Sequence, residues 1–257
     1  MSIFRIVTLA GNTVREAIRS RLFYTLLFLA LVLILTGVLV STLSYVESER
    51  IVQDVGLAAI RLLGIGIAIF LGVGLIHNEI DRRTIYTILS KPVSRAEFVL
   101  GKYLGLVVTV ELLLLAMSLA FTLVSWGVGA PLDGGYAAAL VLAGVELMVV
   151  VAVATFFSAF TTPMLASLFT VGVVFAGHLS RDFQQLGEQS ALGGLGLVTQ
   201  LLYRALPDLA SFNLTVQAVH GLAIAASEVW LPLAYGLGYS AFLVIAAILV
   251  FERRDLH

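Results

Sequence analysis

Long apolar runs alternate with short polar segments along the chain, and six of the runs approach the length of a membrane-crossing helix. A helix needs about 20 apolar residues to cross the roughly 30 Å hydrocarbon core of a bilayer. The six runs are Phe23–Leu43, Val55–Ile76, Leu104–Val124, Ala137–Phe157, Met164–Gly177 and Trp230–Phe251. The fifth is short, and its helix either starts earlier in the Phe156–Thr162 turn or continues to Leu179. The pattern predicts an all-α integral membrane protein with six transmembrane helices in a single transmembrane domain, residues 1–257.

Residues 1–22 have the pattern of an amphipathic helix. The apolar residues form one broad stripe at helical spacing: Ile3, Ile6, Val7, Leu9, Ala10, Val14, Ala17 and Ile18. Four arginines lie beside this stripe: Arg5, Arg15, Arg19 and Arg21. A basic amphipathic helix that leads directly into a span is typical of a helix lying in the plane of the membrane. We therefore expect an in-plane helix here; the alternative is a positively charged flank that only sets the topology.

Segment 77–103 is the most polar stretch of the chain and begins HNEIDRRTIYTILSKPVSR. Asp81 or Thr84 can cap the start of a short helix, and Pro92 ends it because the proline ring clashes with the preceding turn. The apolar residues of this helix share one narrow face: Ile85, Ile88 and Leu89. An apolar ridge with a basic rim suits docking into a groove on another protein. The alternative is a loop whose charges only set the topology.

A second helix is expected directly after this proline. Ser94 and Glu97 have the spacing of a capping box, in which each side chain accepts a hydrogen bond from an otherwise unpaired backbone N–H group. The helix is therefore predicted to begin at about Arg95 and to continue into the third apolar run.

Segment 178–229 contains apolar patches that are too short or too polar to cross a membrane. The patches LVTQLLYRAL and LTVQAVHGLAIAA both have helical apolar spacing. We expect them to lie along the outer membrane interface or to dip into it.

Charge and composition fix the class and the orientation. The chain is 60% hydrophobic and 12% charged, which is typical of a protein that crosses the membrane several times. Eleven of the 15 lysines and arginines lie before the first run, between the second and third, or after the last, which places both termini and the 77–103 loop in the cytoplasm. The net charge of −1 gives no indication of nucleic-acid binding. There is no cysteine, so thiolate metal sites and disulfides are excluded.

The polar segment resembles a known family. The pattern E-x₄-TIYTILSKPVSR-x₂-FVLGK-x₂-G is built on Glu79, Thr84, Pro92, Arg95, Phe98, Gly101, Lys102 and Gly105. It is similar to the second cytoplasmic connection of type-2 ABC transporter permeases. The six runs, the amphipathic start and the long last external segment are also similar to that family, so the resemblance covers the whole chain.

The resemblance implies a type-2 ABC exporter permease fold in the cell inner membrane. Helix 79–92 would be the coupling helix, which docks into a cleft of a separate cytoplasmic ATPase. By position, the residues in contact with the ATPase would be Glu79, Asp81, Arg82, Arg83, Thr84, Ile85, Ile88, Leu89 and Pro92. The family works with two permease halves and two ATPases, which implies a homodimer or a pair with a sister permease. Segment 178–229 would cap the translocation path.

The chain is not expected to be an ATPase itself. A P-loop needs the pattern G-x-x-x-x-G-K-[ST], but position 96, five residues before Gly101, is alanine and position 103 is tyrosine. ATP and Mg²⁺ would then be bound by the partner subunit, and no catalytic residue, cofactor site or metal site is predicted in this chain. The four histidines show no metal-ligand spacing, and structural roles are expected for them.

Three ionisable residues fall within the apolar runs: Arg61, Glu111 and Glu146. Such residues are costly in hydrocarbon unless they are paired, so each marks a candidate functional site. With a rise of about 1.5 Å per residue, Arg61 and Glu146 lie roughly 9 and 13 Å below the external face, whereas Glu111 lies about 10 Å above the cytoplasmic face. Depth therefore favours an Arg61–Glu146 pair. Two interpretations stay open: a polar path or gate for substrate, or a structural ion pair with a separate glutamate.

Two functions fit these patterns best. The first is an export permease driven by a separate ATPase, with membrane lipid as its surroundings. The second is a membrane component that does not transport but relays ATPase-driven motion to an external accessory protein. An ATP-independent carrier is disfavoured because no inverted repeat is evident, and an intramembrane enzyme because no catalytic dyad is.

Overall fold

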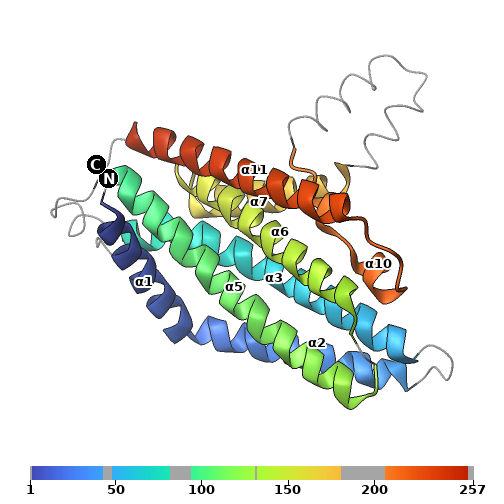
Figure 1. Ribbon diagram of the computed structural model, residues 1–257. Helices are drawn as coiled ribbons and strands as arrows, with labels where there is room; N and C mark the ends of the chain where they lie inside the picture. Colours follow the sequence, from blue (N-terminus) through green and yellow to red (C-terminus); the bar gives the residue numbers. More distant parts are fainter. Residues whose placement is uncertain (1, 43–47, 82–93, 131, 181–205, 254–257) are drawn as a thin grey trace.

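The structure is a computed structural model that describes residues 2–42, 48–81, 94–130, 132–180 and 206–253. In these ranges the chain forms helices that pack side by side into an elongated bundle (Figure 1). The elements are α1 Ile3–Arg19, α2 Arg21–Ser41, α3 Ser48–Asp81, α5 Arg95–Gly127, α6 Gly134–Ser158, α7 Pro163–His178, η1 Leu209–Phe212, α10 Thr215–Val219 and α11 Ala226–Glu252. Within the described residues five helices, α2, α3, α5, α6 and α11, are long and apolar enough to cross a membrane. Helix α7 has 16 residues.

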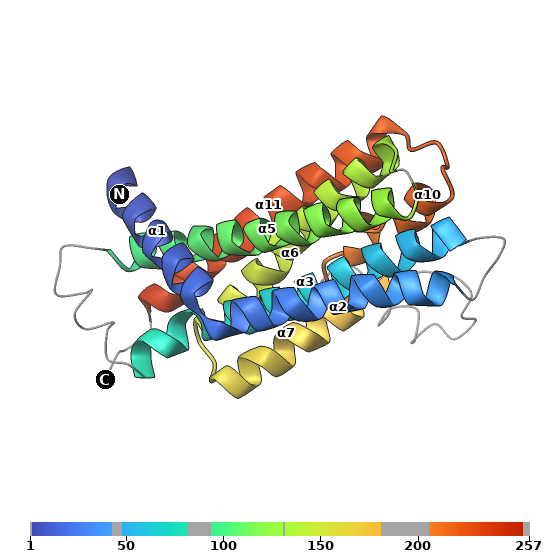
Figure 2. The same ribbon diagram turned by 90° about the horizontal axis from the view of Figure 1, so that it is seen from below.

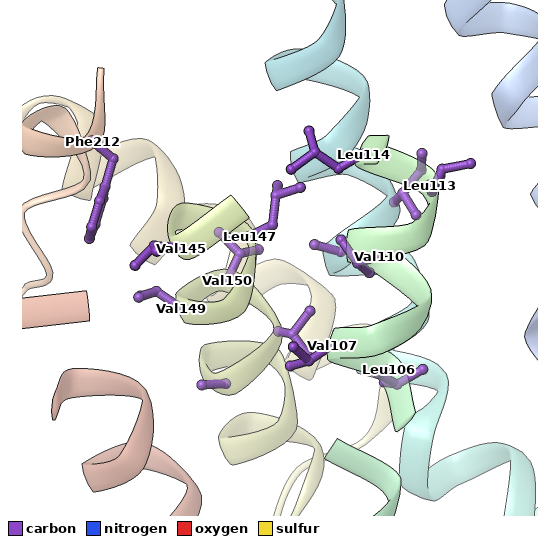
Figure 3. Packing of buried hydrophobic residues seen from close by; sticks show 14 of the residues in the cluster. Leu106, Val107, Val110, Leu113, Leu114, Val145, Leu147, Val149, Val150 and Phe212 are labelled. Atoms are coloured by element: carbon purple, nitrogen blue, oxygen red, sulfur yellow. The ribbon is translucent and has the colours of Figure 1, made fainter. Parts of the chain in front are cut away.

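Helix α6 is the centre of the bundle. It packs against α3, α5, α7 and α11, and its sequence is apolar on every side, which is typical of a helix enclosed by others. Figure 3 shows Val145 and Phe212 facing each other on one side of α6, while Leu147 points away from them and packs on Gly64 of α3. Glycines allow close approach at this centre, since a Cβ atom on Gly72 of α3 would lie 2.5 Å from the Cβ of Ala154.

The two ends of the bundle are built from different elements. At one end the start of α5 lies next to the start of α1 and the end of α11; we call this the junction end. At the other end α10 packs on the first turns of α3 and α6, and η1 packs between α6, α7 and α11; we call residues 206–225 the cap. Figure 2 shows α1 crossing the bundle at the junction end, with α10 at the opposite end.

Most predicted spans lie inside observed helices. Helix α5 begins at Arg95, and its first turn contains the predicted capping box, with the Ser94 hydroxyl accepting from the Glu97 N–H and the Glu97 carboxylate accepting from the Ser94 N–H. The helix that contains the second predicted span is longer than predicted. Helix α3 begins at Ser48 instead of Val55, because its polar first turns still bury Val52 completely.

The cap differs from the expected interfacial helices. Helix α10 covers Thr215–Val219 alone, and Gly221, with φ +60°, ends it in a left-handed conformation that glycine adopts easily. Its buried residues, together with those of η1, pack on the helix bundle: Leu209, Phe212, Leu214, Ala218 and Val219. Leu214, Ala218 and Val219 of the patch LTVQAVHGLAIAA pack on the bundle, whereas Val216 and Leu222 are exposed, so its place along the outer membrane interface or dipping into it stays a prediction. The patch LVTQLLYRAL falls almost entirely on residues outside those described.

Helix α1 packs along the first half of α5. A Cβ atom on Gly105 would lie 2.7 Å from the carbonyl oxygen of Ala10, and one on Gly101 would lie 2.7 Å from the Cβ of Leu9. The two glycines therefore let the helices approach closely, as a G-x-x-x-G spacing predicts. The other side of α1 stays exposed, with Ile3, Phe4 and Val7 more than 60% accessible.

Candidate functional site

Three ionisable side chains meet in the middle of the bundle. The Arg61 guanidinium of α3 donates two hydrogen bonds to Oε2 of Glu146 on α6, at 2.8 Å from Nη2 and 3.1 Å from Nε. Nε2 of His178, the last residue of α7, lies 2.8 Å from the other carboxylate oxygen, Oε1. The structure thus contains the Arg61–Glu146 pair that their depths favour and adds a histidine to it. We call these three residues the ion cluster.

The ion cluster is mostly buried. The side chain of Glu146 is 1% exposed, that of Arg61 is 14% exposed and that of His178 is 32% exposed. A charge this deep is tolerated only when it is paired. Because the three residues come from α3, α6 and α7, the cluster joins three helices of the bundle across its apolar centre.

The geometry around His178 indicates how it takes part. Its Nδ1 lies 2.8 Å from the carbonyl oxygen of Val174, which can only accept, so Nδ1 carries a hydrogen. The carboxylate oxygen opposite Nε2 also only accepts, so the contact is attractive when the imidazole is protonated at both nitrogens. Oε1 accepts no hydrogen bond of good geometry within the described residues, although Nε2 lies 2.8 Å away. The contact is therefore a charge contact, whereas Arg61 makes the aligned hydrogen bonds.

The cap lies directly above this cluster. Gly177, next to His178, packs so closely on the cap that a Cβ atom there would lie 2.7 Å from the carbonyl oxygen of Pro207 and 3.0 Å from Leu209 of η1. The Ser180 hydroxyl donates to the Asp208 carboxylate at 2.8 Å, and the Asp208 N–H donates to the Tyr235 hydroxyl of α11 at 3.1 Å. These contacts link the end of α7 to the cap, so a displacement of α7 at the ion cluster would also displace the cap.

We expect His178→Ala to destabilise the protein modestly, by about 0.6 to 1.7 kcal/mol, the range of polar contacts between membrane helices. Glu146 keeps its two hydrogen bonds from Arg61 in this variant. Unfolding in detergent measures the change. His220→Ala is the matched control, because exposed His220 makes the same Nδ1 contact to a carbonyl four residues earlier, at 3.1 Å. Equal losses in the two variants would show that the carboxylate contact contributes nothing.

Glu111 forms no hydrogen bond or ion pair with the ion cluster within the described residues, but it meets α6 only two residues before Glu146 and not at the deeper level expected. Its carboxylate packs against the backbone of α6 at Gly144, where a Cβ atom would lie 2.7 Å from Oε2. The glycine thus makes room for this carboxyl between α5 and α6. The structure brings two of the three predicted intramembrane residues together, whereas Glu111 lies between α5 and α6 beside Gly144.

The junction end is held by the first turn of α5. The Glu97 carboxylate, 3% exposed, accepts the backbone N–H of Ser2 at 2.6 Å and lies 3.7 Å from the Arg5 guanidinium. These contacts fix the start of α1. Arg95 contacts the end of α11, donating to the carbonyl oxygens of Phe251 and Glu252 at 3.2 and 3.0 Å.

The predicted docking residues fall just before this turn. Helix α3 continues through Asp81, so the backbone of Glu79 and Asp81 belongs to its last turns. The remaining predicted contacts lie outside the described residues: Arg82, Arg83, Thr84, Ile85, Ile88, Leu89 and Pro92. The structure therefore describes the chain up to Asp81 and again from Ser94, and the docking prediction for segment 79–92 stays a prediction.

Sequence reasoning missed two residues of these sites, His178 and Arg95. The depth of His178 could have been found by counting from the short turn between α6 and α7. From that turn Glu146 is about 18 Å up α6 and His178 about 22 Å up α7. The role of Arg95 has no signal in the local sequence, because its acceptors lie 156 and 157 residues further along the chain.

Comparison with known proteins adds the family. A family model described as "ABC-2 family transporter protein" matches residues 7–256. No curated protein matches the chain. The match extends from α1 through the last described helix and includes both the polar segment between α3 and α5 and the ion cluster. The chain therefore belongs to the ABC-2 transporter family, as the membrane component of an ABC transporter.

Proposed function

We propose that this chain is the permease half of an ATP-driven exporter and that segment 79–92 docks into a separate cytoplasmic ATPase. The observation that carries the proposal is the family match over residues 7–256. Membership implies association with a cytoplasmic ATPase subunit, and the amphipathic, basic segment between α3 and α5 is the part of this chain suited to that contact. ATP and Mg²⁺ would be bound by the ATPase, and a second permease half would complete the transporter.

The proposed topology has six spans, with α7 as the fifth. At about 1.5 Å per residue its 16 residues cover roughly 24 Å, less than a full bilayer core. The cap packs on the end of this short helix and would occupy the remaining depth. The junction end would be cytoplasmic, because most lysines and arginines lie there. Helix α1 would lie in the membrane plane, with Ile3, Phe4 and Val7 in the lipid.

We expect Ile85→Asp combined with Leu89→Asp to abolish ATPase binding. A carboxylate buried in an apolar groove without a partner costs several kcal/mol, enough to lose a micromolar complex. The measurement is co-purification, in detergent, of the permease with a candidate ATPase from its own gene neighbourhood. The matched control is Val216→Asp combined with Leu222→Asp, which places two carboxylates at exposed apolar positions of the cap, at the other end of the bundle.

Two outcomes would contradict the proposal. If wild type and the Ile85/Leu89 variant capture the ATPase equally, docking occurs elsewhere on the chain. If wild type captures no ATPase, the chain is not the permease of that transporter. Capture by wild type and by the cap variant, with loss in the Ile85/Leu89 variant, is the expected result.

A further inference from the structure

The end of α11 is attached to the first turn of α5 by polar and aromatic contacts. Nη1 of Arg95 donates to the carbonyl oxygens of Phe251 and Glu252, and the rings of Phe98 and Phe251 stack with centroids 6.2 Å apart. The last carbonyls of a helix have no partner within the helix. A guanidinium there satisfies two of them and is favourably placed at the negative end of the helix dipole.

The other half of α11 contacts the cap. Gly236 faces the ring of Phe212 of η1, and a Cβ atom on this glycine would lie 3.0 Å from the ring edge. Tyr235 accepts the N–H of Asp208 through its hydroxyl, and its ring lies 6.3 Å from that of Phe212. Both contact residues follow Pro232, the proline inside this helix. A bend at the proline would therefore not separate the cap contacts from the end of α11 that Arg95 holds.

These contacts make α11 a continuous connection between the two ends of the bundle. It is 27 residues long, and intrahelical hydrogen bonds make such a helix stiff along its axis. It is attached to the first turn of α5 at one end and to η1 near the other. The residue just before that first turn, Ser94, lies two positions after the end of segment 79–92 in the chain.

We propose that Arg95 is a positioning residue that makes α11 follow the start of α5, so that displacement of the docking segment reaches the cap. The proposal rests on the proposed function, since it needs an ATPase that moves segment 79–92. Phe98 and Phe251 add apolar contact, but the two hydrogen bonds of Arg95 are the directional link to the helix end. The partner affected by this link is the external segment, through Phe212 and Tyr235.

The test measures distances within one chain with and without trapped nucleotide. Because the chain has no cysteine, pairs of spin labels can be introduced cleanly. The distance between labels at Leu249→Cys and Phe160→Cys reports on the junction end of α11. The distance between labels at Val216→Cys and Trp126→Cys reports on the cap. All four positions are at least 45% exposed. Labelled chains are diluted with unlabelled ones in the full complex with the ATPase. Distances are compared without nucleotide and with ADP–vanadate.

The expected result is a nucleotide-dependent shift of both distances in the wild-type complex and loss of both shifts in Arg95→Gln, with ATPase binding unchanged. Arg15→Gln, which removes a charge from an exposed position of α1, should keep both shifts. Arg95→Lys keeps the charge but not the planar fork, so we expect both shifts to be reduced. This variant also serves if the glutamine variant fails to fold. A purely structural loosening would instead broaden both distributions before nucleotide is added.

Other results would overturn the inference. Full shifts in Arg95→Gln would show that α11 moves without this link. Loss of the Leu249 shift alone would show that α11 is not the connection to the cap. Loss of ATPase binding in the Arg95 variants would place Arg95 in the docking surface itself. If the ATPase binds the wild-type permease but neither distance shifts, only this inference is wrong. If the ATPase does not bind the wild-type permease, the proposed function is wrong as well.

Discussion

Glu146→Ala is expected to destabilise the protein by about 3 kcal/mol, because it leaves the Arg61 guanidinium buried without its carboxylate. Breaking a buried ion pair from one side typically costs about 3 to 5 kcal/mol. We expect the lower end of that range, since the Arg61 side chain is 14% exposed and its long stem can move the charge towards the interface. The measurement is unfolding in mixed detergent micelles, followed by the loss of helical circular dichroism.

A double variant separates the cost of an unpaired charge from the contribution of the pair. Replacing both residues, Arg61→Met with Glu146→Met, removes the two opposite charges and keeps similar volumes. Replacing a buried pair by apolar residues is often neutral or stabilising, so this variant should recover most of the lost stability. If the double variant is as unstable as Glu146→Ala, the pair itself, and not the isolated arginine, accounts for the stability.

The same variants decide between the two interpretations of the cluster. If the pair is structural, the stable double variant should retain whatever function the assembled transporter has. If the pair is part of a polar path or gate, function is lost although stability returns. The position of the cluster below η1 favours a role in holding the cap, because α7 carries both His178 and the Gly177 contact to Pro207.

Patterns local in the sequence predict the elements that depend on local physics. The apolar runs give the positions of α2, α5, α6 and α11, and the Ser94–Glu97 spacing gives the start of α5. Depth along a helix pairs Arg61 with Glu146, because both are counted from the external ends of their runs; in the structure both also lie twelve residues from a shared level. That level is set by the Ser158 hydroxyl, which donates to the carbonyl oxygen of Val73 at 3.0 Å.

Features that depend on distant contacts escape such patterns. The polar start of α3 is helical because Val52 and Gln53 are buried by other helices, which no property of the segment itself indicates. The position of the cap is likewise not visible in its own sequence. Leu209 and Phe212 are apolar enough for a membrane interface, and only tertiary packing buries them against the bundle. The hydrogen bonds of Arg95 and Glu97 reach residues near the two ends of the chain. Their partners are the Glu252 carbonyl and the Ser2 N–H, and such backbone groups have no sequence signature.

Gly105→Leu is expected to detach α1 from α5. The new Cβ would lie 2.7 Å from the carbonyl oxygen of Ala10 and 3.0 Å from its Cα, and backbone atoms cannot move aside as the end of a side chain can. Overpacking of this kind costs about 1 to 3 kcal/mol, and 1.4 kcal/mol shifts an equilibrium about tenfold. Detachment exposes Thr13, which is 5% accessible in the packed helix.

The measurement is the maleimide labelling rate of Thr13→Cys, a single thiol in a chain that has none. We expect Gly105→Leu to raise this rate by a factor between about five and about a hundred, which is what 1 to 3 kcal/mol of overpacking strain corresponds to. Gly127→Leu is the matched control on the same helix, because a Cβ atom there meets nothing within 4 Å. The ties of Ser2 and Arg5 to Glu97 hold one end of α1 even when its middle is pushed away. An unchanged rate in Gly105→Leu would therefore mean that these ties and the remaining contacts outweigh the clash, and that the close glycine approach does not determine where α1 lies.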